Sequence, residues 1–332
     1  MAARRRGKKK SGRSYAWRYR GRIVACVFVE VIIICALVIM IGWNKGVKEW
    51  FEQFEQPVLK EVDISGINSP NAILMQARGG KILGEINGEA QIYPASMTKI
   101  MTVILGIENF DDLDEKITLT DEMFSGLYEQ DATQAGFQPG EEVRVIDLLY
   151  GAMLPSGAEC CIALADTISG SEADFAELMN KKARKLGMEN THFCDSTGLH
   201  NPDHYSTVKD IAVLMKYCIK NDTFREIVET SRHSTGVTNI HPDGITYYST
   251  MFKNLSAPTV TGGKILGGKT GYTSEAGHCL VSFAEIEGRE YIFVSAGASG
   301  ADGNTIPHIQ DAVTVYNRVG AAVEAKMNDN NK

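Results

Sequence analysis

Strand-forming sequences lie near both ends of the folded part of this chain, and helix-forming sequences fill the long interval between them. Near the start, residues 72–75 and 81–83 flank the turn sequence Arg-Gly-Gly at 78–80. Near the end, residues 279–286 and 291–297 form a second hairpin pattern. The order predicts an α+β domain in which chain-distant hairpins share one antiparallel sheet, flanked by helices, with a helical subdomain inserted in the middle.

The middle and the end of the chain carry helix signals. A serine and an aspartate three residues apart open the segment 171–187, which ends on a glycine. A threonine and an aspartate open 207–218 in the same way, and apolar residues follow at helical spacing. A closing helix is expected from about Pro307. The apolar faces of these helices are interpreted as packing surfaces.

Charge is distributed unevenly along the 332 residues. Residues 1–22 contain ten Lys or Arg and no acid, which leaves 24 basic and 41 acidic groups, a balance of −17, in the rest. An apolar run interrupted only by Glu30 follows, and it predicts a membrane-spanning helix at 23–42 of about 30 Å. Glu30 is most simply interpreted as one acidic residue that a single-pass membrane helix tolerates. A cleaved signal peptide is the alternative, although no clear cleavage site follows the run.

The position of the basic residues predicts the topology. By the positive-inside rule, the basic tail 1–22 stays in the cytoplasm, and a linker at 43–60 leads to an extracytoplasmic catalytic domain at 61–325 with a polar tail at 326–332. A single-pass protein of the cell membrane is therefore expected, with the lipid bilayer as a partner through 23–42. The basic tail lacks interleaved aromatic residues, so contact with anionic headgroups is favoured over nucleic acid.

Cysteine and histidine give no sign of a metal or a redox centre. Five of the seven cysteines lie beyond the apolar run, without metal-type spacing, and Cys160 and Cys161 fall in an apolar helical stretch typical of a core. His200 and His204 are four residues apart, but the Asn-Pro-Asp sequence between them is typical of a turn. No metal and no cofactor are expected.

Three short motifs occur in order: Ser-x-x-Lys at 96–99, Ser-Gly at 156–157 and Lys-Thr-Gly at 269–271. At the start of a helix, the three-residue spacing places Ser96 and Lys99 on one face, where an uncharged amine can deprotonate the hydroxyl. A lysine amine is ordinarily protonated at neutral pH. Burial and a second nearby cation both favour the neutral form, and the lysine of the third motif is the candidate for that cation.

The combination of these motifs resembles the penicillin-recognising serine hydrolases. The closer resemblance is to the serine D-alanyl-D-alanine carboxypeptidases, the low-molecular-mass penicillin-binding proteins of peptidase family S11. It rests on four segments and covers about residues 61–325; the segments are Tyr93 to Thr102, Met153 to Glu159, Thr191 to Thr207 and Gly268 to Thr273. The resemblance implies the β-lactamase/transpeptidase-like fold.

The resemblance also implies a mechanism. Ser96 attacks the carbonyl between the two terminal D-alanines of a peptidoglycan stem peptide, Lys99 takes its proton, and Ser156 relays a proton to the leaving amine. Water then releases the acyl group, whereas an acceptor amine would make the enzyme a transpeptidase. The backbone N–H groups of Ser96 and Tyr272 form the oxyanion hole. The substrate-binding residues are Lys269, Thr270, Gly271 and Tyr272, and β-lactams are the expected inhibitors.

Two departures from the family pattern bear on activity. The second motif usually ends in Asn, and here that position is Ala158, with Glu159 beside it. The missing amide predicts reduced or redirected activity. Relatives often carry a further β-rich domain and a C-terminal anchor, so the N-terminal segment is expected to tether this chain.

Three alternatives remain. A β-lactamase shares the first and last motifs, but no convincing Glu-x-x-Leu-Asn follows Ser156. A membrane-tethered wall-binding protein with a weakened or inactive site would account for Ala158. A purely structural membrane protein would make the ordered motifs a coincidence.

Overall fold

The computed structural model describes Val31 and residues 59–300 and 306–330. The predicted membrane helix at 23–42, with Glu30, lies outside the described residues except for Val31. Within the part of the chain that is described, no helix combines the length and apolarity needed to cross a bilayer.

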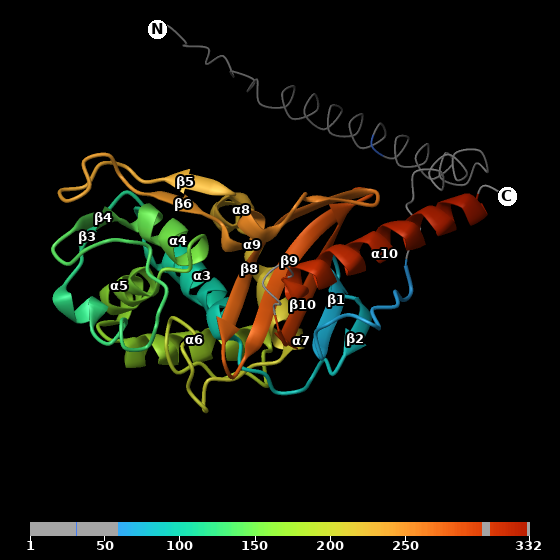
Figure 1. The fold of residues 1–332 in the computed structure, drawn as a ribbon, viewed down its shortest axis with the longest axis horizontal. Helices are drawn as coiled ribbons and strands as arrows, with labels where there is room; N and C mark the ends of the chain where they lie inside the picture. Colours follow the sequence, from blue (N-terminus) through green and yellow to red (C-terminus); the bar gives the residue numbers. More distant parts are fainter. Residues whose placement is uncertain (1–30, 32–58, 301–305, 331–332) are drawn as a thin grey trace, which may run out of the picture. The chain divides into compact units, whose positions relative to one another are not determined.

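A six-stranded antiparallel sheet in the order β2-β1-β10-β9-β8-β7 forms the centre of the fold (Figure 1). Its strands are β1 (Asn71–Gln76), β2 (Ile82–Ile86), β7 (Thr259–Val260), β8 (Gly263–Thr273), β9 (Gly277–Ile286) and β10 (Arg289–Ala298). Both predicted hairpins are present, and β1 joins them by pairing with β10 from Asn71↔Ala296 to Gln76↔Tyr291. The prediction of one sheet built from chain-distant hairpins is confirmed.

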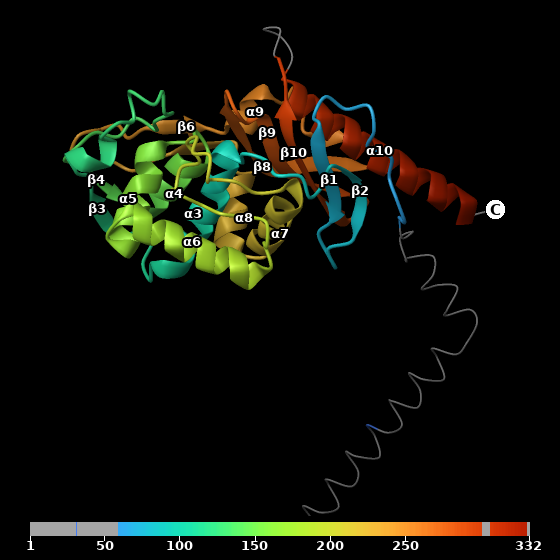
Figure 2. The ribbon, with the colours of Figure 1, turned by 90° about the horizontal axis from the view of Figure 1, so that it is seen from below.

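Each face of the sheet is buried in its own apolar core. Along β10, Ile292 and Val294 belong to the core on the side of the inserted helices, while Tyr291 and Phe293 belong to the core under the C-terminal helix. This alternation follows from the two-residue repeat of a strand. The helix α10 (Pro307–Asn330) covers the second face, lying against β9 and β10 in both ribbon views (Figures 1 and 2).

The segment between β2 and β7 contains the inserted helices and two small hairpins. The helical segments are η1 (Ala95–Thr98), α3 (Lys99–Asn109), η2 (Asp121–Phe124), α4 (Val145–Met153), α5 (Ala158–Ser169), α6 (Glu172–Leu186), α7 (Val208–Cys218), α8 (Asp222–Glu229) and α9 (Thr250–Asn254). The hairpins pair β3 (Lys116–Thr118) with β4 (Glu142–Arg144) and β5 (Arg232–Ser234) with β6 (Thr246–Tyr248).

The capping residues expected from the sequence begin and end the predicted helices. Ser171 Oγ accepts a hydrogen bond from the Asp174 backbone N–H, and α6 ends at Gly187, whose φ of 80° is left-handed. Thr207 caps α7 through the Asp210 N–H. Helix α10 continues to Asn330, so the residues from 326 to 330 are helical.

A buried carboxylate connects the loop before β1 to the helix α10. Asp311 of α10 accepts hydrogen bonds from the backbone N–H of Asn68 at 2.8 Å and of Ser69 at 2.9 Å. It also accepts from Asn68 Nδ2 at 2.7 Å and Ser69 Oγ at 2.6 Å. These four bonds hold the segment that leads into β1 against the helix that covers the sheet.

Candidate active site

Ser96 lies in the short helix η1, one turn before the amine of Lys99, which is the first residue of α3. The helix therefore begins where the sequence predicts, with the serine in a 3₁₀ turn ahead of the α-helix. This pitch brings Lys99 Nζ to 3.0 Å from Ser96 Oγ, and the lysine is only 3% exposed. The preceding residue, Ala95, has a φ of 47°, a left-handed backbone that is uncommon for alanine and is typical of constrained functional turns.

A loop between α6 and α7 fixes the lysine from the other side. Lys99 Nζ donates a hydrogen bond of 2.6 Å to the backbone carbonyl of Thr197. Asp195 holds this carbonyl in place because its Oδ1 accepts from the N–H of Thr197 at 2.8 Å and of Gly198 at 2.7 Å. One N–H of the amine is thus committed to a fixed acceptor, which orients the nitrogen toward Ser96.

The Asp195 carboxylate is itself held by His204. Asp195 Oδ2 lies 3.1 Å from His204 Nδ1, and His204 Nε2 lies 2.9 Å from Thr98 Oγ1 in the serine motif. Burial acts to raise the pKa of Asp195, but the bonds to His204, Thr197 and Gly198 outweigh it and lower that pKa to about 2. The carboxylate is therefore ionised at neutral pH.

Ser156 occupies a strained turn between α4 and α5. It is the only residue of its motif with a left-handed backbone, at a φ of 73°, and it is almost fully buried. Beside it, Glu159 Oε1 accepts from the N–H of Ala135 at 2.6 Å and of Gly136 at 3.0 Å. Burial raises the pKa of Glu159. The acid next to the second motif therefore ties a loop of the helical part to the turn that presents Ser156.

Lys269 approaches Ser156 from strand β8. Its Nζ donates to Ser156 Oγ at 3.0 Å and to the Thr270 carbonyl at 2.9 Å. Burial first, and then the positive charge of Lys99, hold the pKa of Lys269 well below the usual lysine value. The two lysines were expected to be coupled, with Lys269 acting on Lys99. The effect of Lys99 on Lys269 is consistent with a coupling between the two amines, and the action of Lys269 on Lys99 stays a prediction.

The close approach of β8 to the serine turn depends on a glycine. A Cβ on Gly271 would lie 3.0 Å from the backbone nitrogen of Ser96 and 3.2 Å from the Pro94 carbonyl. Only a residue without a side chain lets the strand come this near. Next along the strand, Tyr272 is 61% exposed, and before it Thr270 Oγ1 lies 2.7 Å from Thr250 Oγ1 of α9. The four predicted substrate-binding residues therefore line one stretch of strand beside Ser96.

The comparisons with known proteins agree with this arrangement. The family model for D-alanyl-D-alanine carboxypeptidase, Peptidase_S11, matches residues 58–300. The chain belongs to this family. It is similar to the D-alanyl-D-alanine carboxypeptidase DacF of Bacillus subtilis (strain 168), with 34% identity over 231 residues, 69% of this chain and 57% of the relative. For DacC of Escherichia coli (strain K12) the identity is 33% over 262 residues, 71% of this chain and 58% of the relative.

Solved structures show the same fold. The Streptomyces K15 DD-transpeptidase superposes with a TM-score of 0.69 at 28% identity, covering 79% of this chain and 100% of that one. A D-alanyl-D-alanine carboxypeptidase from Mycobacterium tuberculosis gives 0.69 at 22% identity, covering 80% and 96%, and shows the fold alone. The chain spans less than two thirds of the length of the two curated relatives. The predicted penicillin-recognising fold is confirmed.

Ala158, the departure from the family's second motif, is the first residue of α5 and is buried. Its backbone N–H donates to the Thr133 carbonyl at 2.8 Å, which adds to the attachment of the loop that Glu159 holds. The family amide is therefore replaced by a methyl group at a position fixed by backbone contacts. Its effect on turnover stays a prediction.

Sequence reasoning missed the residues that hold Lys99 in place. The segment from Thr191 to Thr207 carries part of the family resemblance, but no role was assigned to Asp195 or Thr197. Thr197 acts through its backbone carbonyl. Every residue type has this group, so the sequence gives no signal of the role. His204 lies within hydrogen-bond distance of Thr98 Oγ1 and Asp195 Oδ2, and no cluster suited to a metal ion occurs in the part of the chain that the structure describes.

Proposed function

We propose that this chain removes the terminal D-alanine from peptidoglycan stem pentapeptides through an acyl-enzyme on Ser96. The observation that carries the proposal is the 3.0 Å contact between Ser96 Oγ and the buried Lys99 Nζ. The second supporting feature is the strand β8, which brings Lys269 and Gly271 to the two serines. Family membership supplies the substrate class.

Acylation begins when Lys99 accepts the Ser96 proton and the oxygen attacks the carbonyl between the terminal D-alanines. The backbone N–H groups of Ser96 and Tyr272 stabilise the oxyanion. The C–N bond then breaks, the proton that Lys99 took from Ser96 passes through Ser156 to the leaving amine, and D-alanine departs. Lys269 and Thr270 bind the terminal carboxylate during this step. Water then attacks the ester and gives a proton to Lys99, and Lys99 passes a proton to Ser96 Oγ as its bond to the acyl group breaks.

Mass spectrometry of a disaccharide pentapeptide incubated with the full chain tests this proposal. Loss of one alanine is expected, and Ser96→Ala should abolish it. An unaltered pentapeptide after long incubation would refute the carboxypeptidase assignment. Persistence of the reaction in Ser96→Ala would instead refute the nucleophile.

Transpeptidation is a second candidate, favoured by the likeness to the Streptomyces K15 protein, which is called a DD-transpeptidase. The acyl-enzyme is the same, and only the group that attacks it differs. Adding a simple amine such as glycine to the incubation distinguishes the two. A new amide product that grows with glycine concentration indicates transfer, and free tetrapeptide alone indicates hydrolysis.

Labelled penicillin separates the remaining alternatives. A persistent adduct on Ser96 supports the peptidase, rapid release of hydrolysed penicillin supports a β-lactamase, and no adduct supports a wall-binding protein with an inactive site. The loss of labelling in Ser96→Ala is the control.

We also propose that residues 23–42 anchor the chain in the cell membrane with residues 1–22 in the cytoplasm. The support is the apolar run and the ten basic residues before it. Deletion of residues 1–42 should move the protein from the membrane fraction to the soluble fraction. Retention of the truncated protein in the membrane would contradict the proposal.

A further inference from the structure

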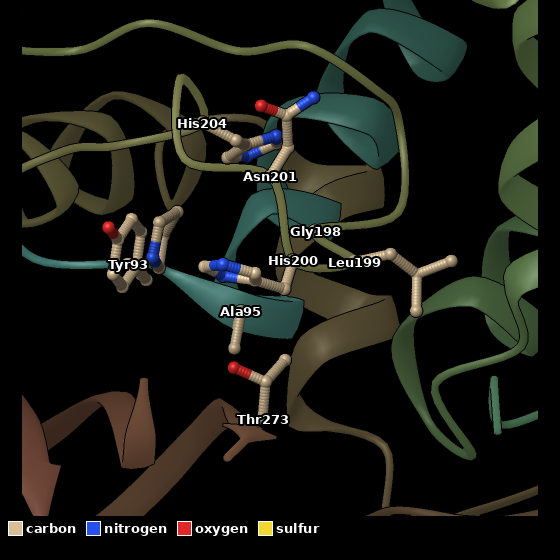
Figure 3. Close-up of a pocket in the computed structure, with 9 residues that line it drawn as sticks. Tyr93, Ala95, Gly198, Leu199, His200, Asn201, His204 and Thr273 are labelled. Atoms are coloured by element: carbon tan, nitrogen blue, oxygen red, sulfur yellow. The ribbon is translucent and has the colours of Figure 1, made fainter. Parts of the chain in front are cut away.

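The backbone N–H of Tyr272 is one of the two donors of the proposed oxyanion hole, and it lies close to the end of a strand. Strand β8 ends at Thr273, one residue later. Figure 3 shows Thr273 beside Ala95 of the serine turn, and both residues line the same small hollow. The donor therefore lies where β8 meets the serine turn, and the ends of strands are where a sheet frays most readily.

Strand pairing supports this stretch of β8 from one side. Among the described strands, β7 pairs with Gly263 and Lys264 of β8, whereas Tyr272 pairs only with His278 of β9. An N–H group that binds an oxyanion cannot also donate to β9. The sheet therefore holds Tyr272 less firmly than a residue that is paired on both sides, and the packing of its side chain becomes important for the position of the donor.

The side chain of Tyr272 lies on the face of the sheet opposite to the serines. Lys269 and Gly271 approach the serines, and successive residues of a strand point to opposite faces, so Tyr272 points toward the face that α10 covers. Its paired partner His278 points to this face as well, because it lies an even number of residues before Ile286 of the core beneath α10. Figures 1 and 2 show α10 lying across this face.

Three rings are in contact on this face. The ring centroids of Tyr272 and His278 are 4.6 Å apart. His278 also stacks on His308, the second residue of α10, with centroids 5.0 Å apart and an interplanar angle of 7°. Tyr272 is largely exposed, His278 is half-buried and His308 is buried, so the ring stack runs from the surface into the protein.

Charge does not oppose the ring stack at neutral pH. Burial lowers the pKa of His278, and burial followed by the effect of His278 lowers the pKa of His308 to about 4. The Asp311 carboxylate, one turn along α10, acts in the other direction with a smaller effect. Both imidazoles are therefore mainly neutral, and they stack without the repulsion between two cations.

We propose that His278 is a positioning residue for the oxyanion hole, because its ring, in contact with both Tyr272 and His308, fixes the strand end that carries the Tyr272 N–H. The inference rests on the proposed acyl-enzyme function and adds to it a residue that acts from the opposite face of the sheet. His308 is a firm support for the stack because Asp311 attaches α10 to the segment before β1.

The rate of acylation by labelled penicillin, measured on the full chain over a range of concentrations, tests this role. Removal of an entire oxyanion donor slows a reaction by about 100-fold to 1,000-fold, and a displaced donor keeps part of its effect. We therefore expect His278→Ala to slow the saturating acylation rate by about tenfold. The penicillin concentration that gives half of this rate should change by less than about twofold, because the oxyanion forms only after binding.

A rescue variant and a control variant separate positioning from stability. His278→Phe keeps a flat ring in the stack and should acylate within about twofold of the wild-type rate. Ile286→Ala removes a fully buried side chain from the same face of β9, at its far end, and should keep the wild-type rate while it remains folded. An unchanged rate in His278→Ala, or an equally slow rate in His278→Phe or Ile286→Ala, would overturn the inference.

A double-mutant cycle tests whether His278 acts through the ring of Tyr272. Tyr272→Ala removes this ring but leaves the backbone N–H, so adding His278→Ala to it should slow acylation no further. Multiplicative effects of the two substitutions would overturn the inference and leave the acyl-enzyme on Ser96 intact. Failure of the wild type to form any penicillin adduct would overturn the proposed function, and this inference with it.

Discussion

Lys269 is a buried amine placed close enough to a second lysine for the two charges to repel. Its folded-state pKa lies below the unfolded value of about 10.4 because burial and then Lys99 disfavour its charged form. Between these two pKa values the unfolded chain binds more protons. The free energy of unfolding therefore rises with pH across this window.

Lys269→Met should remove this rise. As the pH increases toward 10, the unfolding free energy of the wild type should rise relative to that of the variant. The relative rise should be at most about 1.4 kcal/mol per pH unit. Urea denaturation at several pH values measures it. Lys264→Met, on the exposed part of the same strand, is the control and should keep the wild-type slope. A slope in Lys269→Met equal to that of wild type would contradict the perturbed amine.

Ala158 presents a methyl group where the family places an amide. Ala158→Asn restores a donor and an acceptor beside Ser156, and we expect D-alanine release from a stem pentapeptide to increase several-fold. Steady-state kinetics of the two proteins give the answer. Unchanged turnover would mean that this position is immaterial to the reaction.

The element that decides the geometry of the site is β8, because it is packed against the serine turn without a side chain between them. Gly271→Ala would introduce a Cβ 3.0 Å from the Ser96 nitrogen and 3.1 Å from the Ala95 Cβ. The strand must then move away, and we expect acylation by penicillin to slow by tenfold or more. The rate of adduct formation measures this. Gly236→Ala, whose Cβ would make an ordinary contact of 3.7 Å, should acylate like wild type.

The loop from Asp195 to Gly198 is the second such element, and its stability depends on one carboxylate. Asp195→Asn should cost about 2 kcal/mol, the contribution of a hydrogen bond to a charged group. Acylation should slow as well, because the Thr197 carbonyl no longer fixes Lys99. Equilibrium unfolding and penicillin labelling measure the two effects.

The same carboxylate gives a pH dependence with a defined sign. The pKa of Asp195 is lowered to about 2 in the folded protein, against about 3.9 unfolded. Its stabilisation is complete above the unfolded value and is lost as the pH falls from about 4 to about 2. Asp195→Asn should lack this part of the loss of stability at acid pH. An identical dependence of stability on pH in both proteins would refute the lowered pKa of Asp195.

At the scale of the whole molecule, Asp311 connects residues more than 240 positions apart. Asp311→Ala leaves two backbone N–H groups without their acceptor, and we expect a loss of about 2 to 4 kcal/mol in the free energy of unfolding. Urea denaturation tests it, with Asp329→Ala at the exposed end of the same helix as the control. Equal stability of Asp311→Ala and wild type would show that the contact is not stabilising.

The sequence allowed prediction of the elements with strong local signals. The hairpins β1–β2 and β9–β10 have apolar, β-rich runs on either side of turn residues, and α6 and α7 begin at capping residues. The small hairpins β3–β4 and β5–β6 were missed because strands of three residues are too short to show alternation. In the site, the side-chain motifs were visible, whereas the Thr197 carbonyl and the Thr250 hydroxyl owe their places to tertiary packing alone.

The pairing of β1 with β10 has a consequence for biosynthesis. Strand β1 cannot pair with β10 until β10 leaves the ribosome, more than 200 residues later. Lys269 also emerges long after Ser96. Contacts of such sequence separation form slowly. A nascent chain interrupted before β10 lacks the strand that joins β1 to β9 in the sheet. Acylating activity should therefore appear only when translation is nearly complete.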